Sequence, residues 1–220
     1  MVLIDSWADF LPTLMRGVKI TLLVTIYSTI FAFVMSFIAG FGRLSKFRII
    51  RWVTVIYVEI FRGTSLLVQL FWIYFALPML IDVRVSALMA SVLALGLNSG
   101  AYGSEVVRSS ILAVPRGQTE ATIALNMTPG QRMRLVILPQ AFVRMLPAFG
   151  NLLIELLKGT SLVSFITVMD LTYQGMILRS YSNYHTTEIF IMLLVIYFII
   201  AYVLTLIVRW FEKRAAAGRS

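Results

Sequence analysis

The sequence contains no cysteine and only one histidine, His185, among its 220 residues. The lack of cysteine excludes disulfides, thiolate metal sites and cysteine nucleophiles, and a single histidine gives no metal-ligand cluster. The phosphate-loop pattern G-x-x-x-x-G-K-[ST] is also missing, so any nucleotide energy must come from another chain. We therefore expect no metal, no cofactor and no enzymatic activity of the chain's own.

Charged residues are also scarce. They make up 13% of the chain, whereas 60% of the residues are hydrophobic, a composition well outside the range of soluble domains. The net charge of +9 comes from basic residues at the ends of apolar runs, which indicates membrane topology rather than nucleic-acid binding. The sequence thus predicts an all-α, polytopic membrane protein with one domain.

Five segments are long enough to cross a hydrocarbon layer of roughly 30 Å as helices. The second and fourth contain charged residues three positions apart, which share one helix face and do not exclude a span. In the third segment, Gly96, Gly100 and Gly103 indicate close helix packing rather than a pore. The predicted spans cover residues 20–41, 53–81, 85–106, 145–169 and 189–208.

Orientation follows from the basic residues in the connections. Thirteen of them follow the first span, flank the third connection or follow the fifth span, and four lie on the opposite side. We therefore expect the N-terminus outside and the C-terminus inside the cell. The expected organisation is an outer segment at residues 1–18, a transmembrane domain at 19–212 and an inner tail at 213–220.

Residues 114–141 form the only long hydrophilic stretch, and they predict a helical hairpin. Pro115 favours the start of a first helix, and Asn126 can end it because asparagine tolerates the left-handed conformation. Thr128 can then cap a second helix, with Gln131 placed to bond back to it. Pro139 either ends that helix or begins a third. A capped, basic hairpin between two spans is typical of a docking surface for a soluble partner.

The hairpin and three other stretches resemble the permease subunits of bacterial ABC importers of the polar amino acid uptake family. The coupling motif of that family is matched by Glu120-Ala121 and by Ile137-Leu138-Pro139, with Thr122 in place of a second alanine and Asn126 in place of glycine. The other matching stretches are Arg62–Gln69, Asn98–Arg108 and Leu157–Leu162. The resemblance covers roughly residues 12 to 212.

The resemblance implies a type I ABC importer transmembrane fold in the bacterial cytoplasmic membrane. The implied partners are an ATPase dimer, a second permease chain that is the same or homologous, a periplasmic or lipid-anchored solute-binding protein, and membrane lipid. Alternating access would carry a polar amino acid or similar zwitterion. Coupling to the ATPase would involve Gly117, Glu120, Ala121, Ala124, Asn126, Met127 and Pro139.

Polar residues within the spans are candidates for the solute path. A charge at bilayer depth costs at least ~2.5 kcal/mol, so such a residue is expected to have a partner or a function. Both signs of charge would suit a zwitterion. For Glu59 with Arg62 and Glu155 with Lys158, the sequence favours simple mutual neutralisation instead. Gln69, Asn98 and Tyr102 fit substrate contact and interhelical hydrogen bonding equally. The candidates are Glu59, Arg62, Gln69, Asn98, Tyr102, Glu105, Glu155, Lys158, Thr160 and Ser161.

Two other classes of protein compete with the importer subunit. A secondary transporter or channel without an ATPase partner would be favoured by inverted repeats, and the sequence has no such symmetry. A membrane-embedded enzyme would need a nucleophile with a base, or a metal cluster, and the residues for these are missing.

Overall fold

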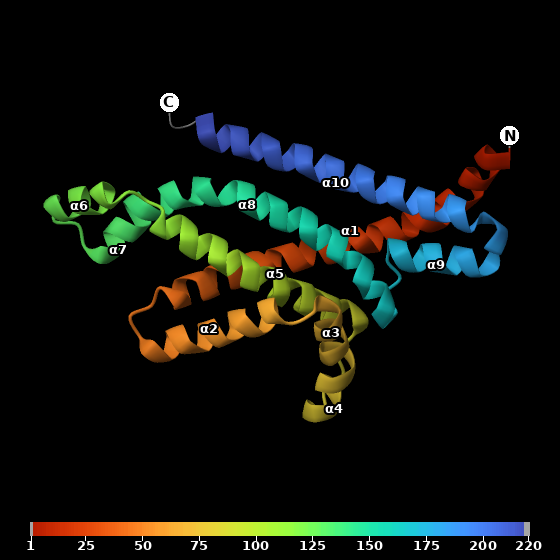
Figure 1. Ribbon diagram of the computed structural model, residues 1–220, viewed down its shortest axis with the longest axis horizontal. Coiled ribbons are helices and arrows are strands. Elements are labelled where there is room, and N and C mark those ends of the chain that lie inside the picture. The colour runs from red at the N-terminus through yellow and green to blue at the C-terminus, as the bar shows by residue number, and fades with distance from the viewer. Residues whose placement is uncertain (1, 218–220) are drawn as a thin grey trace.

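The computed structural model describes residues 2–217, with side chains for residues 9–182 and 184–215, and the described chain is helical without a strand. Figure 1 shows the hairpin helices α6 and α7 and the C-terminal end at one end of the molecule, with the N-terminal end and α9 at the other. The predicted all-helical class is confirmed. The long helices run roughly along the long axis: α1 (Val2–Arg43), α2 (Arg48–Gly63), α5 (Ala87–Leu112), α8 (Leu138–Gly159) and α10 (Thr186–Ala217).

Helices α1 and α5 pack closely along much of their length. The glycines of α5 make this approach possible, since a Cβ atom added at Gly96, Gly100 or Gly103 would overlap Phe31, Met35 or Ser36 of α1. The prediction that these glycines serve helix packing is confirmed. The hydroxyls of Ser91 and Ser104 on α5 donate to carbonyls of the same helix, which satisfies these two polar groups inside the bundle.

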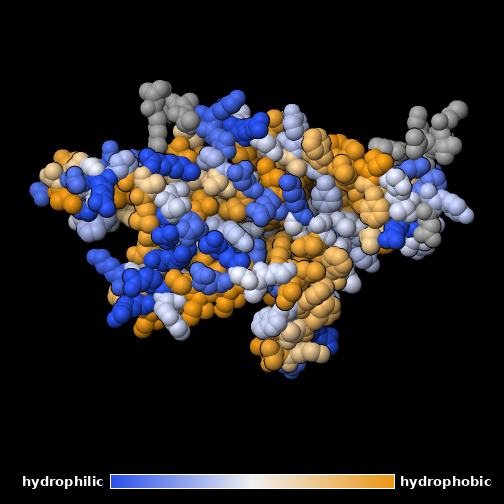
Figure 2. Space-filling view, viewed as in Figure 1, coloured by the Kyte–Doolittle hydropathy of each residue, from blue (hydrophilic) through white to orange (hydrophobic). Residues whose placement is uncertain are grey.

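The predicted second span is not one helix. Helix α2 ends at Gly63, Thr64 and Ser65 are extended, and the chain continues through α3 (Leu66–Phe71), the π-helical segment η1 (Trp72–Ala76) and α4 (Leu77–Ile81). The chain changes direction by 110° between the two halves. The segment predicted as a span over 53–81 therefore contains a sharp bend, which the sequence did not indicate because hydropathy measures length and composition but not direction. Figure 2 shows mainly hydrophobic side chains over residues 66–81, the α3–α4 arm.

Three helical stretches of the described chain are long and apolar enough to cross a membrane, at residues 9–43, 129–166 and 186–215. The bent pair of α2 and the α3–α4 arm adds a fourth if it is a single span. Helix α5 is not among them, and much of it is surrounded by protein rather than lipid. The count of five spans therefore stays a prediction.

The hairpin has the local structure that its sequence predicts. Helix α6 (Arg116–Ala124) is followed by Asn126 at a φ of 52°, in the left-handed region. The second arm begins at α7 (Pro129–Arg132), where Thr128 and Gln131 form a capping box. It continues through η2 (Met133–Ile137) directly into α8. The sequence allows two roles for Pro139. In the structure it has the second one and lies at the start of a third helix, α8. The second arm and α8 therefore form one continuous helical segment.

The connection between α8 and α10 is folded onto the bundle. It consists of η3 (Thr160–Ile166), α9 (Leu171–Tyr181) and η4 (Asn183–His185). Asp170 is fully buried and caps α9, accepting hydrogen bonds from the backbone N–H groups of Thr172 and Tyr173 and from the hydroxyl of Tyr197 on α10. The backbone N–H of Leu171 donates to Thr21 of α1. Burial raises the pKa of Asp170 to about 6, and the hydrogen bonds offset only part of that rise.

Asp170 should make stability depend on pH. Its folded-state pKa is above its ordinary value of 3.8, so the folded protein binds this proton more tightly than the unfolded chain. The resulting stabilisation, on the order of 3 kcal/mol, is present below pH ~4 and lost as pH rises through ~6. Asp170→Asn removes this contribution. The melting temperature of the wild type should therefore fall relative to that of Asp170→Asn as pH rises from 4 to 7; parallel curves for the two purified proteins would show that Asp170 does not titrate as described.

Candidate functional site

A polar cleft lies where the break between α2 and α3 meets α5, the end of α8 and η3. Its volume is about 470 Å³. Five of the ten predicted path residues line it, and Thr64, Ser99 and several leucines complete the wall. The five are Asn98 and Tyr102 on α5, Glu155 and Lys158 on α8, and Ser161 on η3.

The two predicted ion pairs do not form. Among the described side chains, no ion pair joins Glu59 to Arg62 or Glu155 to Lys158. The favoured interpretation of mutual neutralisation is therefore wrong, because spacing by three places two residues on one face without bringing their charged ends together. The Arg62 guanidinium instead lies over the Tyr102 ring, 5.3 Å from its centroid. Glu155 and Lys158 are both exposed and line the cleft.

Gln69 and Asn98 hold the break between α2 and α3. The side-chain N–H groups of both residues donate to the carbonyl of Phe61, each at 2.9 Å, and Asn98 also donates to the Gln69 amide oxygen at 3.0 Å. Gln69 further donates to the Thr64 hydroxyl at 2.7 Å. Carbonyls released at a helix break need such partners where water is scarce. Of the two roles left open by the sequence, the structure shows interhelical hydrogen bonding for both residues, with Asn98 also on the cleft wall.

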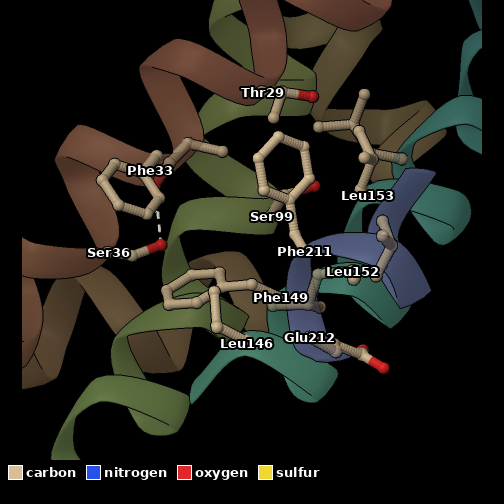
Figure 3. A pocket seen from close by; sticks show the side chains of 14 residues that line it. Thr29, Phe33, Ser36, Ser99, Leu146, Phe149, Leu152, Leu153, Phe211 and Glu212 are labelled. Atoms are coloured by element: carbon tan, nitrogen blue, oxygen red, sulfur yellow. Dashed lines mark hydrogen bonds between the residues drawn. The ribbon is translucent and has the colours of Figure 1, made fainter. Parts of the chain in front are cut away.

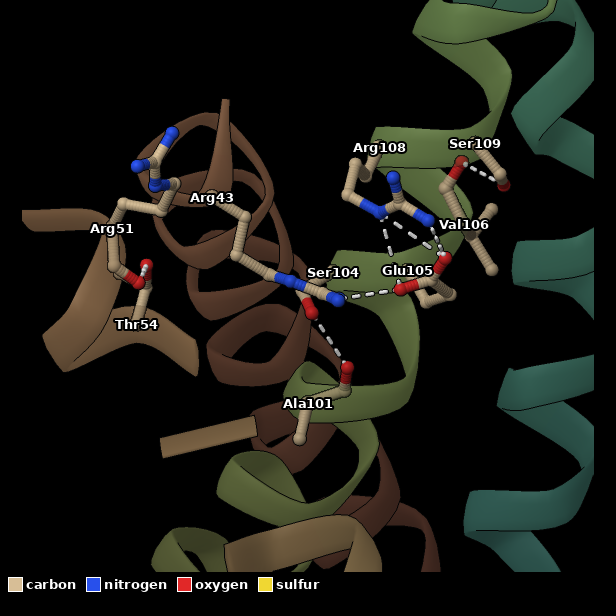
Figure 4. Close-up of polar contacts among 9 residues, drawn as sticks. All are labelled: Arg43, Arg51, Thr54, Ala101, Ser104, Glu105, Val106, Arg108 and Ser109. Carbon is tan, nitrogen blue, oxygen red and sulfur yellow. Dashed lines mark hydrogen bonds and ion pairs between the residues drawn. The ribbon is translucent and has the colours of Figure 1, made fainter. Parts of the chain in front are cut away.

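The remaining predicted path residues lie elsewhere. Glu59 is exposed on α2 outside the cleft, and Thr160 is fully buried with its hydroxyl donating to the carbonyl of Leu157. Glu105 lies near the hairpin end of α5, between Arg43 and Arg108 (Figure 4). The i,i+3 spacing of Glu105 and Arg108 is visible in the sequence. The bond from Arg43, 62 positions away, is not.

An apolar cavity of about 210 Å³ lies beside the polar cleft, between α1, α5, α8 and α10. Figure 3 shows the rings of Phe33, Phe149 and Phe211 around it. Ser99, Leu152 and Leu156 line both spaces and form the wall between them. The lining of this cavity is mostly apolar, with Glu212 as its charged member, whereas the polar cleft has charges of both signs.

The hairpin presents an outward surface. Six of the seven predicted coupling residues are exposed, and Met127 is half-buried. Thr122, which replaces an alanine of the motif, is buried on the inner side, so this departure does not alter the outward face. Sequence reasoning missed three exposed apolar side chains on this surface, which the hydrophobic pattern of a docking face would have indicated: Ile123, Leu125 and Leu135.

The described part of the chain has no group of three or more potential metal ligands. An exposed hairpin at one end of a bundle of apolar helices, with a polar cleft between the helices, is the architecture of a membrane transport subunit. Comparison with known proteins agrees: the chain belongs to the family described as binding-protein-dependent transport system inner membrane component, whose family model matches residues 11–217.

The three similar proteins described next are permease proteins by name. The chain is 48% identical to a probable amino-acid ABC transporter permease protein, y4tF, of Sinorhizobium fredii, over 97% of this chain and 92% of the relative. It is 38% identical to the glutamine transport system permease protein GlnP of Escherichia coli, over 93% of each chain. It is 35% identical to the arginine transport system permease protein ArtQ of Bacillus subtilis, over 93% of each chain.

Solved structures agree with the fold. An amino acid ABC transporter with histidines is 37% identical, with a TM-score of 0.88, over 95% of this chain and 97% of the other. The MetNI methionine ABC transporter shares the fold, with a TM-score of 0.77 and 22% identity over 94% of this chain and 98% of the other. The chain is thus a multi-pass inner-membrane permease subunit of an ABC importer, not itself catalytic. The family assignment favours this function over a secondary transporter or channel.

The amide network at the helix break should behave as one unit. Gln69→Met and Asn98→Leu each remove partners of buried carbonyls, at roughly 1–3 kcal/mol. Because the two amides bond to each other and share the Phe61 carbonyl, the double variant should lose less stability than the sum of the single losses. Melting of the purified variants measures this coupling. Strictly additive losses would mean that the two side chains do not act together at the break.

Proposed function

We propose that the chain carries a small amino-acid-like zwitterion through the polar cleft. The observation that carries this proposal is the exposure of both charges, Glu155 and Lys158, in one cleft without an ion pair between them. A solute with an ammonium and a carboxylate group matches the two charges, and the hydroxyls of Tyr102 and Ser161 add uncharged hydrogen-bonding groups. The naming of relatives as glutamine and arginine permeases supports this substrate class.

A second permease chain, the same or homologous, covers the polar face of α2. Arg48, Arg51, Glu59 and Arg62 recur at helical spacing along one side of this helix, and all four are exposed. Figure 2 shows hydrophilic side chains gathered in a band across the middle of the viewed face. Glu59 and Arg62 lie within the predicted span at 53–81, where lipid tolerates charges poorly because each costs at least ~2.5 kcal/mol at bilayer depth. A partner that presents an equivalent polar face would enclose a hydrated path between the two chains.

The hairpin docks on an ATPase dimer inside the cell, and a solute-binding protein delivers the substrate at the opposite end. The distribution of basic residues supports this orientation, with thirteen on the hairpin side and four on the other. The hairpin lies at the same end of the bundle as the C-terminal end, as this orientation requires (Figure 1). Its exposed apolar residues suit burial in a protein groove.

Coupling should depend on the hairpin turn. Asn126→Val places a β-branched side chain at a φ of 52°, which costs on the order of 1 kcal/mol and distorts the docking surface. Glu120→Arg reverses a charge on the same surface. ATP-driven uptake into proteoliposomes should fall in both variants while membrane insertion is unchanged. Asp82→Val is the matched control, because Asp82 has a φ of 50° at the end of α4, far from the hairpin. Normal uptake by both hairpin variants would refute the coupling role.

The cleft charges should control uptake affinity. Glu155→Gln and Lys158→Met each remove one contact to the zwitterion, so the KM for uptake should rise about tenfold with the binding protein unchanged. Asp82→Asn and Lys213→Met lose the same charges outside the cleft and serve as controls. The exchanged pair Glu155→Lys with Lys158→Glu should not recover, because the two residues do not neutralise each other. Full recovery by the exchanged pair would instead show that they pair in the working transporter.

A further inference from the structure

Three charged side chains join the ends of α1 and α5 near the hairpin (Figure 4). Arg43, the last residue of α1, donates from Nη1 to Oε2 of Glu105 at 2.5 Å. Arg108, one turn along α5, donates from Nη2 to Oε1 at 2.6 Å. Both oxygens of one carboxylate are therefore engaged, one across a helix interface and one within a helix. Arg43, Glu105 and Arg108 are called the Glu105 cluster below.

The helix ends beside this cluster share one hydrophobic core with the hairpin. Val107 and Ile111 of α5 pack with Ile137 at the base of the second arm and with Met145 of α8, and Phe41 of α1 packs against the same group. Gly40 of α1 approaches Val107 so closely that a Cβ atom would overlap it. The hairpin, α5, α8 and the end of α1 therefore form one packed block.

Apolar packing and polar bonds hold this block together in different ways. Each apolar contact is individually weak and is not directional, so it sets the position of α1 along α5 less exactly than a directional bond does. A charge-assisted hydrogen bond between guanidinium and carboxylate fixes distance and direction together. The side chains of Arg43 and Glu105 are 14% and 31% exposed, so water screens this bond less than it screens a bond on the open surface.

We propose that Glu105 is a positioning residue for coupling, which fixes the end of α1 to α5 so that α1 follows when the ATPase displaces the hairpin. From Arg43 the motion passes through the short connection at residues 44–47 into α2, which ends at the break beside the polar cleft. Gly42 of α1 also packs directly against Thr54 of α2. The inference rests on the proposed docking of the hairpin on an ATPase.

The two ion pairs of the cluster should differ in importance. Only the Arg43–Glu105 bond crosses between helices, whereas the Arg108–Glu105 bond lies within α5. Arg43→Gln should therefore resemble Glu105→Gln, and Arg108→Gln should have a smaller effect. Arg43→Lys keeps the charge and should recover part of the loss. A cluster that only stabilised the fold would show this order in melting temperature, whereas the inference predicts it in the number of amino acid molecules imported per ATP hydrolysed.

The test uses the complete transporter, with both permease chains, the ATPase and the binding protein, in proteoliposomes. Radiolabelled L-glutamine, L-arginine and L-cystine are offered to the wild type, and the one taken up fastest is the probe. Glu105→Gln and Arg43→Gln should lower the amino acid molecules imported per ATP hydrolysed about fivefold or more, while ATP hydrolysis continues. Glu188→Gln, which breaks the i,i+3 ion pair with His185 at the other end of the bundle, is the control and should leave the ratio unchanged.

The inference is overturned if the number of amino acid molecules imported per ATP hydrolysed is unchanged in both Glu105→Gln and Arg43→Gln. It is also overturned if melting temperature, hydrolysis and uptake all fall together while that number stays the same. Glu120→Arg separates this failure from failure of the proposed function. If Glu120→Arg is defective and the two cluster variants are normal, the hairpin docks but Glu105 does not position α1. If Glu120→Arg is normal, hairpin docking itself is wrong.

Discussion

The close approach of α1 and α5 is the contact on which the rest of the structure depends. It exists because α5 has glycine at the positions that face α1, so the aromatic and apolar side chains of α1 fill the space instead. With one side of α5 occupied in this way, its other side carries Asn98 and Tyr102 to the polar cleft. A helix that looks too polar for a lipid-facing span is thus suited to the centre of a bundle, where its serine hydroxyls bond to its own carbonyls.

The break between α2 and α3 gives the cleft its place. A bend of 110° releases backbone carbonyls, and inside a membrane such irregular backbone persists only where other groups bond to it. Gln69 and Asn98 supply those bonds from two different helices. The same residues therefore shape the cleft without being its charged groups. Glu155 and Lys158 on α8 carry the charges of the cleft.

The sequence predicted what depends on local chemistry. The turn at Asn126 and the capping box at Thr128 involve residues within a few positions of each other, and both are confirmed. The helix break was missed because a hydropathy window does not register a change in direction. The pairing of Glu155 with Lys158 was wrong because helical spacing does not fix where long side chains point.

Contacts between distant segments lay beyond sequence reasoning altogether. Arg62 lies against Tyr102. Arg43 donates a hydrogen bond to Glu105, although α2 and the α3–α4 arm lie between these two residues in the sequence. Nothing in the residue spacing indicates either contact. Five predicted path residues line the cleft because the motifs that contain them converge on the helix break. Glu105 belongs instead to the hairpin end of the bundle, where it joins two helices.

The central claim is that the hairpin and the end of α1 move as one body. The chain has no cysteine, so Lys46→Cys and Arg134→Cys, both at exposed positions, allow two spin labels at the α1–α2 corner and on the second hairpin arm. The distance between the labels is measured in one labelled permease chain per complex, nucleotide-free and trapped with ATP. The account predicts the same narrow distance distribution in both states, and a broadened one in Glu105→Gln. A clear shift between the two states in the otherwise wild-type chain would contradict it.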